Sequence, residues 1–208
     1  MPRRRLAPDQ RRRELLTHGL LAFSSRPYDE VTVAEIADAA GASEGLVFRY
    51  FGDKRSFYVE AIRAVLAMTL EASDPDPTLP PRERFEHGLL SFVDLVERFP
   101  YAVPHVLLGG PASEPGLREE IEAVRESVAT RVIERMGVTD PSPRLRWAVR
   151  AWMLFVQDST TTWLERPGEV SREDLLAAQI VSFRALAADA LGVEPVPTEP
   201  GSPPPLLP

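Results

Sequence analysis

The residues best suited to recognise another molecule lie in a short predicted helix, residues 43–51. Val47 and Phe51 are four residues apart, so both should face the interior of the protein. Phe48 and Arg49 should then face outward. A guanidinium such as that of Arg49 can donate two hydrogen bonds to O6 and N7 of guanine, and an aromatic ring can contact the methyl group of thymine. These residue types at this spacing predict a helix that reads the edges of DNA bases.

A second helix is predicted immediately before the first, over residues 32–40. Thr32 and Glu35 have the spacing of a capping box, in which the threonine caps the helix and the glutamate reaches back to the threonine N–H. Gly41 follows and is the residue type best able to adopt the left-handed conformation that ends a helix. Ser43 is a candidate N-cap for the next helix. Two helices joined by such a tight turn predict a helix-turn-helix, whose second helix can lie in the DNA major groove.

The rest of the chain also has helical periodicity, with no alternating strand pattern and no internal repeat. We therefore predict an all-α protein of about nine helices. Besides the two described above, the predicted helices cover about residues 9–25, 54–72, 85–99, 101–108, 114–136, 145–166 and 171–191.

The composition is that of an ordinary globular protein, with 44% hydrophobic and 26% charged residues among 208. The chain contains no cysteine, which excludes disulfides, thiol catalysis and cysteine metal sites. The basic start of the chain is not followed by the apolar segment of a signal peptide. Since no apolar run approaches the ~18 residues that a membrane span needs, we expect a cytoplasmic protein without membrane contact.

The net charge of −7 is divided unevenly along the chain. Residues 1–60 carry ten basic and nine acidic side chains, whereas residues 61–208 carry 14 basic and 22 acidic ones. Basic runs at residues 3–5 and 11–13 concentrate positive charge at the start, where DNA phosphates would be contacted.

Residues 10–60 resemble the DNA-binding domain of TetR-type (tetracycline-repressor-like) transcriptional regulators. The matching residues are Phe23, Tyr28, Val31, Thr32, Val33, Ile36, Ala37, Ala40, Gly41, Ala42, Ser43, Gly45, Phe48, Tyr50, Phe51 and Lys54. Two positions depart from the family pattern, since Pro27 replaces the usual glycine and Phe48 the usual tyrosine. Without the hydroxyl, residue 48 cannot make the polar contact to DNA that a tyrosine would make.

The resemblance implies roles for residues around the predicted reading helix. Tyr50 and Lys54 match family positions that hold flanking phosphates, and the N-terminal amides near Thr32 and Val33 can do the same. The predicted DNA-binding residues are Thr32, Val33, Ser43, Glu44, Gly45, Leu46, Phe48, Arg49, Tyr50 and Lys54.

The resemblance also implies a division of the chain. Residues 1–54 should form a three-helix DNA-binding domain, and residues 55–192 a helical domain for ligand binding and dimerisation. Residues 193–208 are rich in proline and are expected to be a disordered tail.

Aromatic residues in the second half of the chain are candidates for a ligand cavity. A stripe such as Phe85, Phe92 and Phe99 is more often core than pocket, yet it could line an apolar cavity with few polar groups. The resemblance favours the cavity, because family members commonly bind a small inducer, and the rings indicate a hydrophobic or aromatic ligand. The predicted lining residues are Phe85, Phe92, Phe99, Tyr101, His105, Trp152, Phe155 and Gln157.

The last two predicted helices are the most apolar and resemble those that form a four-helix bundle between two family members. The predicted dimer contacts are Trp163, Leu176, Ile180, Phe183 and Ala187.

One motif typical of enzymes is present but lacks its structural context. Residues 41–45 satisfy G-x-S-x-G, yet a helix rather than a strand precedes Ser43, so the serine is not placed as a nucleophile. His18, His87 and His105 are isolated and lack metal-ligand spacing. We predict no catalytic residue, no metal and no cofactor.

The sequence therefore predicts a dimeric, ligand-responsive transcriptional repressor that binds a palindromic DNA operator and is released by an apolar or aromatic small molecule. Two alternatives stay open at this point. One is a helical small-molecule-binding protein without specific DNA binding, and the more remote one is a helical enzyme.

Overall fold

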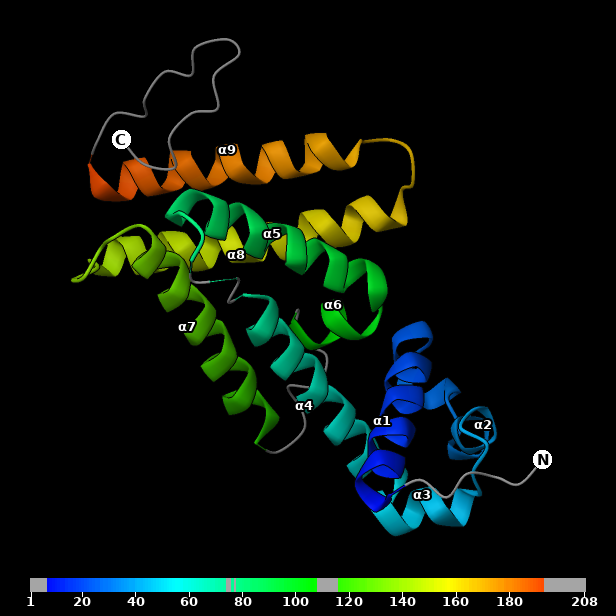
Figure 1. The fold of residues 1–208 in the computed structure, drawn as a ribbon. Helices are drawn as coiled ribbons and strands as arrows, with labels where there is room; N and C mark the ends of the chain where they lie inside the picture. Colours follow the sequence, from blue (N-terminus) through cyan, green and yellow to red (C-terminus); the bar gives the residue numbers. More distant parts are fainter. Residues whose placement is uncertain (1–6, 74–75, 77, 108–115, 193–208) are drawn as a thin grey trace.

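Every regular element in the described part of the chain is a helix, which confirms the predicted all-α class (Figure 1). The computed structural model describes residues 7–73, 76, 78–107 and 116–192. The predicted basic run 3–5 and the proline-rich tail 193–208 lie outside the described residues. The elements are α1 (Pro8–Ser25), the short 3-10 helix η1 (Tyr28–Glu30), α2 (Val33–Ala39), α3 (Glu44–Phe51), α4 (Lys54–Ala72), α5 (Pro81–Arg98), α6 (Ala102–Leu107), α7 (Leu117–Arg135), α8 (Pro143–Glu165) and α9 (Arg172–Leu191).

Side chains at the N-termini explain where α2 and α4 begin. The Thr32 hydroxyl accepts a hydrogen bond from the Glu35 N–H at 3.2 Å, and the Glu35 carboxylate accepts one from the Thr32 N–H at 3.1 Å. The predicted capping box is therefore present. Asp53 caps α4 by accepting a hydrogen bond from the Ser56 N–H at 2.7 Å.

The turn between α2 and α3 has Gly41 and Ser43 at the predicted positions. Gly41 has a φ of +60°, the left-handed conformation that glycine adopts without a steric penalty. Ser43 occupies the N-cap position of α3, but its hydroxyl makes no capping hydrogen bond. The Leu46 N–H bonds to the Ser43 carbonyl oxygen at 2.9 Å instead, so Ser43 is the N-cap residue of α3 through its backbone rather than its hydroxyl.

The first three helices pack around the N-terminal part of α4. Phe57 of α4 is fully buried, and its ring stacks on that of Phe51 with centroids 4.2 Å apart. Phe23 of α1 meets the same ring edge-on at 5.9 Å. Gly19 faces Phe57 so closely that an added Cβ would lie 2.3 Å from the ring. The orientation of α3 is therefore set by aromatic packing between α1 and α4.

The core around α4 also contains side chains from later helices. Val103 and Val106 of α6 and Leu117 of α7 are buried in the same cluster as Phe57. Figure 1 shows α4 running from the α1–α3 group into the rest of the molecule. This helix is thus packed on both halves of the chain.

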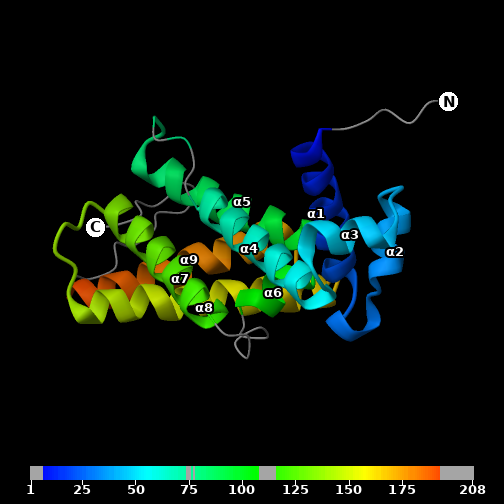
Figure 2. The same ribbon diagram turned by 90° about the horizontal axis from the view of Figure 1, so that it is seen from below.

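A second core joins α5, α7, α8 and α9. Phe85, Trp152 and Phe183 pack ring against ring at its centre, with centroids 4.5–5.4 Å apart. Figures 1 and 2 show α8 and α9 side by side at the end of the molecule remote from α1–α3. Within the described residues, no helix has the combination of length and apolar composition that crossing a membrane requires.

Candidate DNA-binding surface and ligand cavity

One face of α3 is buried and the other is open, as its residue spacing predicts. Val47 and Phe51 are 1% and 7% exposed, whereas Phe48 is 40% exposed. Arg49 is exposed as well, and its guanidinium forms no ion pair with another described residue. The open face therefore presents a cation beside an aromatic ring on a helix that the core holds in place.

The other predicted DNA-binding residues of α3 are distributed around that face. Glu44 and Gly45 are exposed at the first turn, and Ser43 is exposed just before it. Leu46 and Tyr50 are half-buried and pack against the core around Phe57, which is the first of the two cores. They therefore border the open face rather than project from it.

At the start of α2, the backbone rather than the side chains is available for contact with a DNA phosphate. The Thr32 hydroxyl is engaged in the capping box, and Val33 is buried with 5% exposure. Hydrogen bonding to the Thr32 N–H, together with the Arg26 guanidinium at 3.1 Å, holds the pKa of Glu35 below its usual value. A carboxylate is therefore present at neutral pH at this helix end, where a phosphate would also be attracted.

Lys54 is held at the first turn of α4 by an aromatic ring. Its Nζ atom lies 4.2 Å from the centroid of the Tyr28 ring, a cation–π contact. The Tyr28 ring in turn packs on Tyr58 with centroids 4.8 Å apart. The ammonium group thus has a defined place close to the end of α3.

Two of the three basic residues at 11–13 are engaged within the chain. Arg11 pairs with Glu14 at 2.6 Å, and Arg12 pairs with Glu60 at 3.0 Å while lying over the Phe51 ring. The Arg12 guanidinium braces α1 against α3 and α4, and Arg11 donates to the Ala40 carbonyl oxygen at the end of α2 at 3.3 Å. The positive charge expected for phosphate contact is therefore reduced there. Arg13 is exposed.

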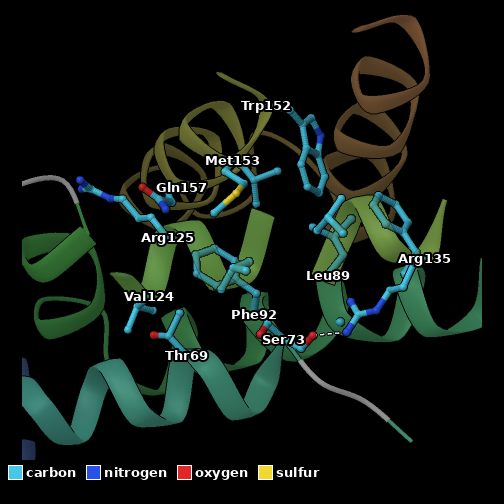
Figure 3. Close-up of a pocket in the computed structure, with 15 residues that line it drawn as sticks. Thr69, Ser73, Leu89, Phe92, Val124, Arg125, Arg135, Trp152, Met153 and Gln157 are labelled. Carbon is cyan, nitrogen blue, oxygen red and sulfur yellow. Dashed lines mark hydrogen bonds between the residues drawn. The ribbon is translucent and has the colours of Figure 1, made fainter. Parts of the chain in front are cut away.

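A cavity lies between α4, α5, α7 and α8 (Figure 3). The space between its walls is about 650 Å³ when the solvent at its open mouth is counted, and the cavity volume itself is about 70 Å³. Its walls are mostly apolar. The lining residues are Thr69, Ser73, Phe85, Gly88, Leu89, Phe92, Val124, Arg125, Val128, Val132, Arg135, Trp152, Met153, Val156 and Gln157.

Half of the predicted lining residues are in this cavity. Phe85, Phe92, Trp152 and Gln157 line it. The prediction did not include Met153 or the two arginines. The lining valines of α7, Val124, Val128 and Val132, are four residues apart, a spacing from which helical periodicity alone places them on one face.

The other predicted lining residues lie elsewhere. Phe99 is buried in the first core, and Tyr101 is 56% exposed. Phe155 is 42% exposed because it lies two residues before Gln157, about 200° around the axis of α8. The side chain of His105 lies outside the described residues.

The polar groups of the cavity differ in whether they have hydrogen-bond partners within the protein. The Thr69 hydroxyl donates to the Val65 carbonyl oxygen at 2.9 Å, and Arg125 pairs with Glu122. Gln157 is only 6% exposed, and its buried Oε1 atom has no hydrogen-bond partner within the described part of the chain. An unsatisfied buried acceptor is costly, so this amide is the polar group most in need of a partner.

Side chains of α7 hold α4 at two levels. Near the first turn of α7, Glu120 receives hydrogen bonds from Arg63 at 2.9–3.3 Å, and this contact holds the pKa of Glu120 below its usual value. At the other end, Arg131 donates to the Ser73 hydroxyl at 2.9 Å, and Arg135 donates to the Ser73 carbonyl oxygen. Ser73 and Arg135 also line the cavity, so the end of α4 forms part of its wall.

The predicted dimer contacts on α9 face the chain's own core. Phe183 and Ala187 are each 1% exposed, and Leu176 and Ile180 pack against the same cluster. Trp163 donates its indole N–H to the Val170 carbonyl oxygen at 2.9 Å. Periodicity identified the apolar stripe of α9, but it could not distinguish a stripe buried within one protomer from one buried between two.

The opposite faces of α8 and α9 carry exposed apolar side chains instead. The most exposed large ones are Trp147, Leu154, Phe155 and Val181, at 68%, 51%, 42% and 61% exposure.

Comparison with known proteins gives two family matches. Residues 15–61 match the family described as bacterial regulatory proteins, tetR family, and residues 81–186 match the tetracyclin repressor-like C-terminal domain. The chain is 21% identical over 189 residues to the HTH-type transcriptional activator FasR of Mycolicibacterium smegmatis, a match that covers 85% of this chain and 82% of FasR.

Solved structures agree with these matches. A tetR-family transcriptional regulator from Streptomyces coelicolor has a TM-score of 0.75 and 25% identity, covering 91% of this chain and 92% of that one. The regulator LfrR from Mycobacterium smegmatis, solved in complex with proflavine, has a TM-score of 0.57 and 19% identity, with coverage of 92% and 98%.

Proposed function

The chain belongs to the tetR family of bacterial regulatory proteins, and from this premise we propose that it is a ligand-responsive repressor that binds a palindromic operator as a homodimer. As a member of that family it is a transcriptional regulator with a helix-turn-helix domain and not an enzyme. The observation that carries the finer proposal is α4, which starts beside the exposed face of α3 and ends in the wall of the cavity.

In the proposed complex, α3 lies in the major groove. Arg49 and Phe48 contact base edges, Gly45 allows close approach, and Tyr50 and Lys54 contact flanking phosphates. This assignment is supported by the exposure of Phe48 and Arg49 and by the fixed position of the Lys54 ammonium. Residues 1–54 would then be the DNA-binding unit, and residues 55–192 the unit that binds ligand and dimerises.

We place the dimer contact on the outer faces of α8 and α9. The exposed Trp147, Leu154, Phe155 and Val181 form the apolar surface that a partner copy would cover. A two-fold axis through this surface brings the same faces together and produces a four-helix bundle. The two copies of α3 would then lie on one side of the dimer and read two half-sites related by symmetry.

Ligand binding would act through the end of α4. A molecule in the cavity contacts Thr69 and Ser73 directly and lies beside Arg135, which holds the Ser73 carbonyl oxygen. A shift of this end changes the position of Lys54 and α3 at the other end, since α4 is one continuous helix. The coupling requires that the ligand prefer the arrangement that does not fit DNA, because equal affinity for both arrangements shifts nothing.

The relatives support a regulator but differ in the direction of its effect. FasR is named an activator, whereas the C-terminal match is to tetracyclin repressor-like domains. LfrR was solved in complex with proflavine, which supports binding of a small molecule by this chain.

The test is selection of DNA from a random pool by the full-length protein, followed by gel shifts over a salt series. We expect the recovered sequences to share a two-fold symmetric site that binds at least about 10³-fold more tightly than random DNA. A pool without shared sequence, together with intact binding of small molecules, would identify a ligand-binding protein that lacks specific DNA recognition.

A further inference from the structure

The hydrogen-bonding groups at one end of the cavity specify the head group of its ligand. Gln157 presents a buried Oε1 atom without a partner in the described residues, and this oxygen can only accept a hydrogen bond. Arg125 lies at the same end of the cavity (Figure 3), and its guanidinium can only donate. A group that fits between them must donate to the first and accept from the second.

A hydroxyl satisfies both requirements with a single oxygen. Its O–H donates to Gln157 Oε1, and its lone pairs accept from Arg125. A carboxylate has no proton to donate and would place negative charge beside the amide oxygen. An ether accepts but cannot donate, so it would leave Oε1 unsatisfied.

The charges of the wall disfavour a cationic ligand, although Arg125 is paired with Glu122. Among the described lining residues there is no Asp, Glu, Lys or His, and the two charged groups, Arg125 and Arg135, are both positive. An ammonium group would lose its hydration in this cavity without meeting a carboxylate.

The rest of the cavity has an elongated, mostly apolar wall. Arg125 and Arg135 lie at opposite ends in Figure 3, ten residues apart on α7, which is about 15 Å along a helix. Val128 and Val132 line the wall between them, and the rings of Phe92 and Trp152 face them from α5 and α8.

We infer that the ligand is an uncharged, elongated lipophile with a hydroxyl group, bound with the hydroxyl between Gln157 and Arg125. This inference rests on the proposed function of the cavity as the ligand site and adds the chemical class of the ligand.

The probes are four compounds with one apolar body and different head groups, 4-hexylphenol, 4-hexylanisole, 4-hexylbenzoate and 4-hexylbenzylamine. Their binding to the full-length protein is measured by calorimetry at pH 7 in the absence of DNA. The phenol should bind about tenfold more tightly than the anisole, which lacks the donor. The benzoate should bind more weakly than the phenol, and the benzylammonium most weakly of all.

Gln157→Leu removes the acceptor and replaces the amide by an apolar side chain of similar volume. In this variant the phenol and the anisole should bind equally well, because the difference between them depends on Oε1. Asp158→Asn is the matched control, since Asp158 is exposed, lies outside the cavity and follows Gln157 directly. The control should keep the tenfold preference for the phenol.

Tighter binding of the benzoate or of the benzylammonium than of the phenol would overturn the hydroxyl assignment while leaving the cavity as a ligand site. Failure of all four probes to bind would overturn it as well. Neither result depends on DNA, so a failure of the proposed operator binding is recognised separately in the gel shifts.

Discussion

Arg49 and Lys54 are both cations near the proposed DNA surface, but their surroundings assign them different roles. Arg49 projects from the exposed face of α3, whereas Lys54 is held over the Tyr28 ring at the edge of that face. Arg49→Ala should reduce the difference in affinity between operator and random DNA by about 1–3 kcal/mol, because it removes a base contact. Lys54→Ala should weaken binding to both DNAs equally and lower the salt slope by about one unit per protomer.

The measurement is binding of both variants to both DNAs over a salt series. The assignment of Arg49 is contradicted if Arg49→Ala weakens both DNAs equally with a shallower salt dependence, since that is the behaviour of a phosphate contact.

Single side chains were predictable from sequence where local spacing decides their position. Val47 and Phe51 turn inward and Phe48 turns outward because a short helix packed on one side allows only that arrangement. Phe155 and Phe183 were not placed correctly, since both α8 and α9 carry apolar residues on two faces. Which face meets the chain's own core depends on contacts with α5 and α7, and the local pattern of apolar residues does not reveal these contacts.

At the scale of elements, the contact between α1 and α4 depends on the lack of a side chain at Gly19. A Cβ there would lie 2.3 Å from the buried Phe57 ring. Gly19→Ala should therefore lower the free energy of unfolding by about 1–2 kcal/mol, because the cost of overpacking exceeds the gain in helix propensity.

Gly45→Ala is the matched control for this substitution. Gly45 is also helical, but an added Cβ there meets nothing within 4 Å. Chemical denaturation should show that Gly45→Ala is neutral or stabilising. Equal effects of the two substitutions would refute the packing argument.

The ion pair between α4 and α7 predicts a dependence on pH. Arg63 holds the pKa of Glu120 below its usual value of 4.5, so the pair stabilises the fold above that pH and is lost as the pH falls through the lowered pKa. Since both side chains are partly exposed, Glu120→Gln should cost no more than about 1 kcal/mol at pH 7. The difference from wild type in unfolding free energy should vanish in acid, and a difference that grows there would contradict the assignment.

The boundaries of most elements were predictable because capping residues, glycines and prolines mark them. The capping box at Thr32 and the cap at Asp53 are examples. The cavity was predictable only in part, since its wall combines side chains from α4, α5, α7 and α8 whose relative rotation no local pattern specifies.

At the scale of the whole molecule, the proposed dimer predicts different outcomes for two neighbouring residues of α9. Val181→Arg places a charge on the outer face, where Val181 is 61% exposed, and should give a folded monomer. Phe183→Arg places the charge in the second core and should unfold the protomer, at a cost above about 3 kcal/mol. Sedimentation combined with circular dichroism separates the two. If Val181→Arg is still a dimer, the interface lies on another surface of the protein.

The claim that the dimer presents two copies of α3 to successive major grooves can be measured as a distance. The chain has no cysteine, so Ala39→Cys at an exposed position of α2 gives one spin label per protomer without further substitutions. Double electron–electron resonance on the selected operator should give one narrow distance between the α2 labels, of the value that the geometry requires when the two copies of α3 are one turn of DNA, about 34–36 Å, apart. A broader distribution should return when the DNA is removed. If no coupling between protomers is detected, or if the distribution is the same with and without operator, the proposed mode of DNA recognition is wrong.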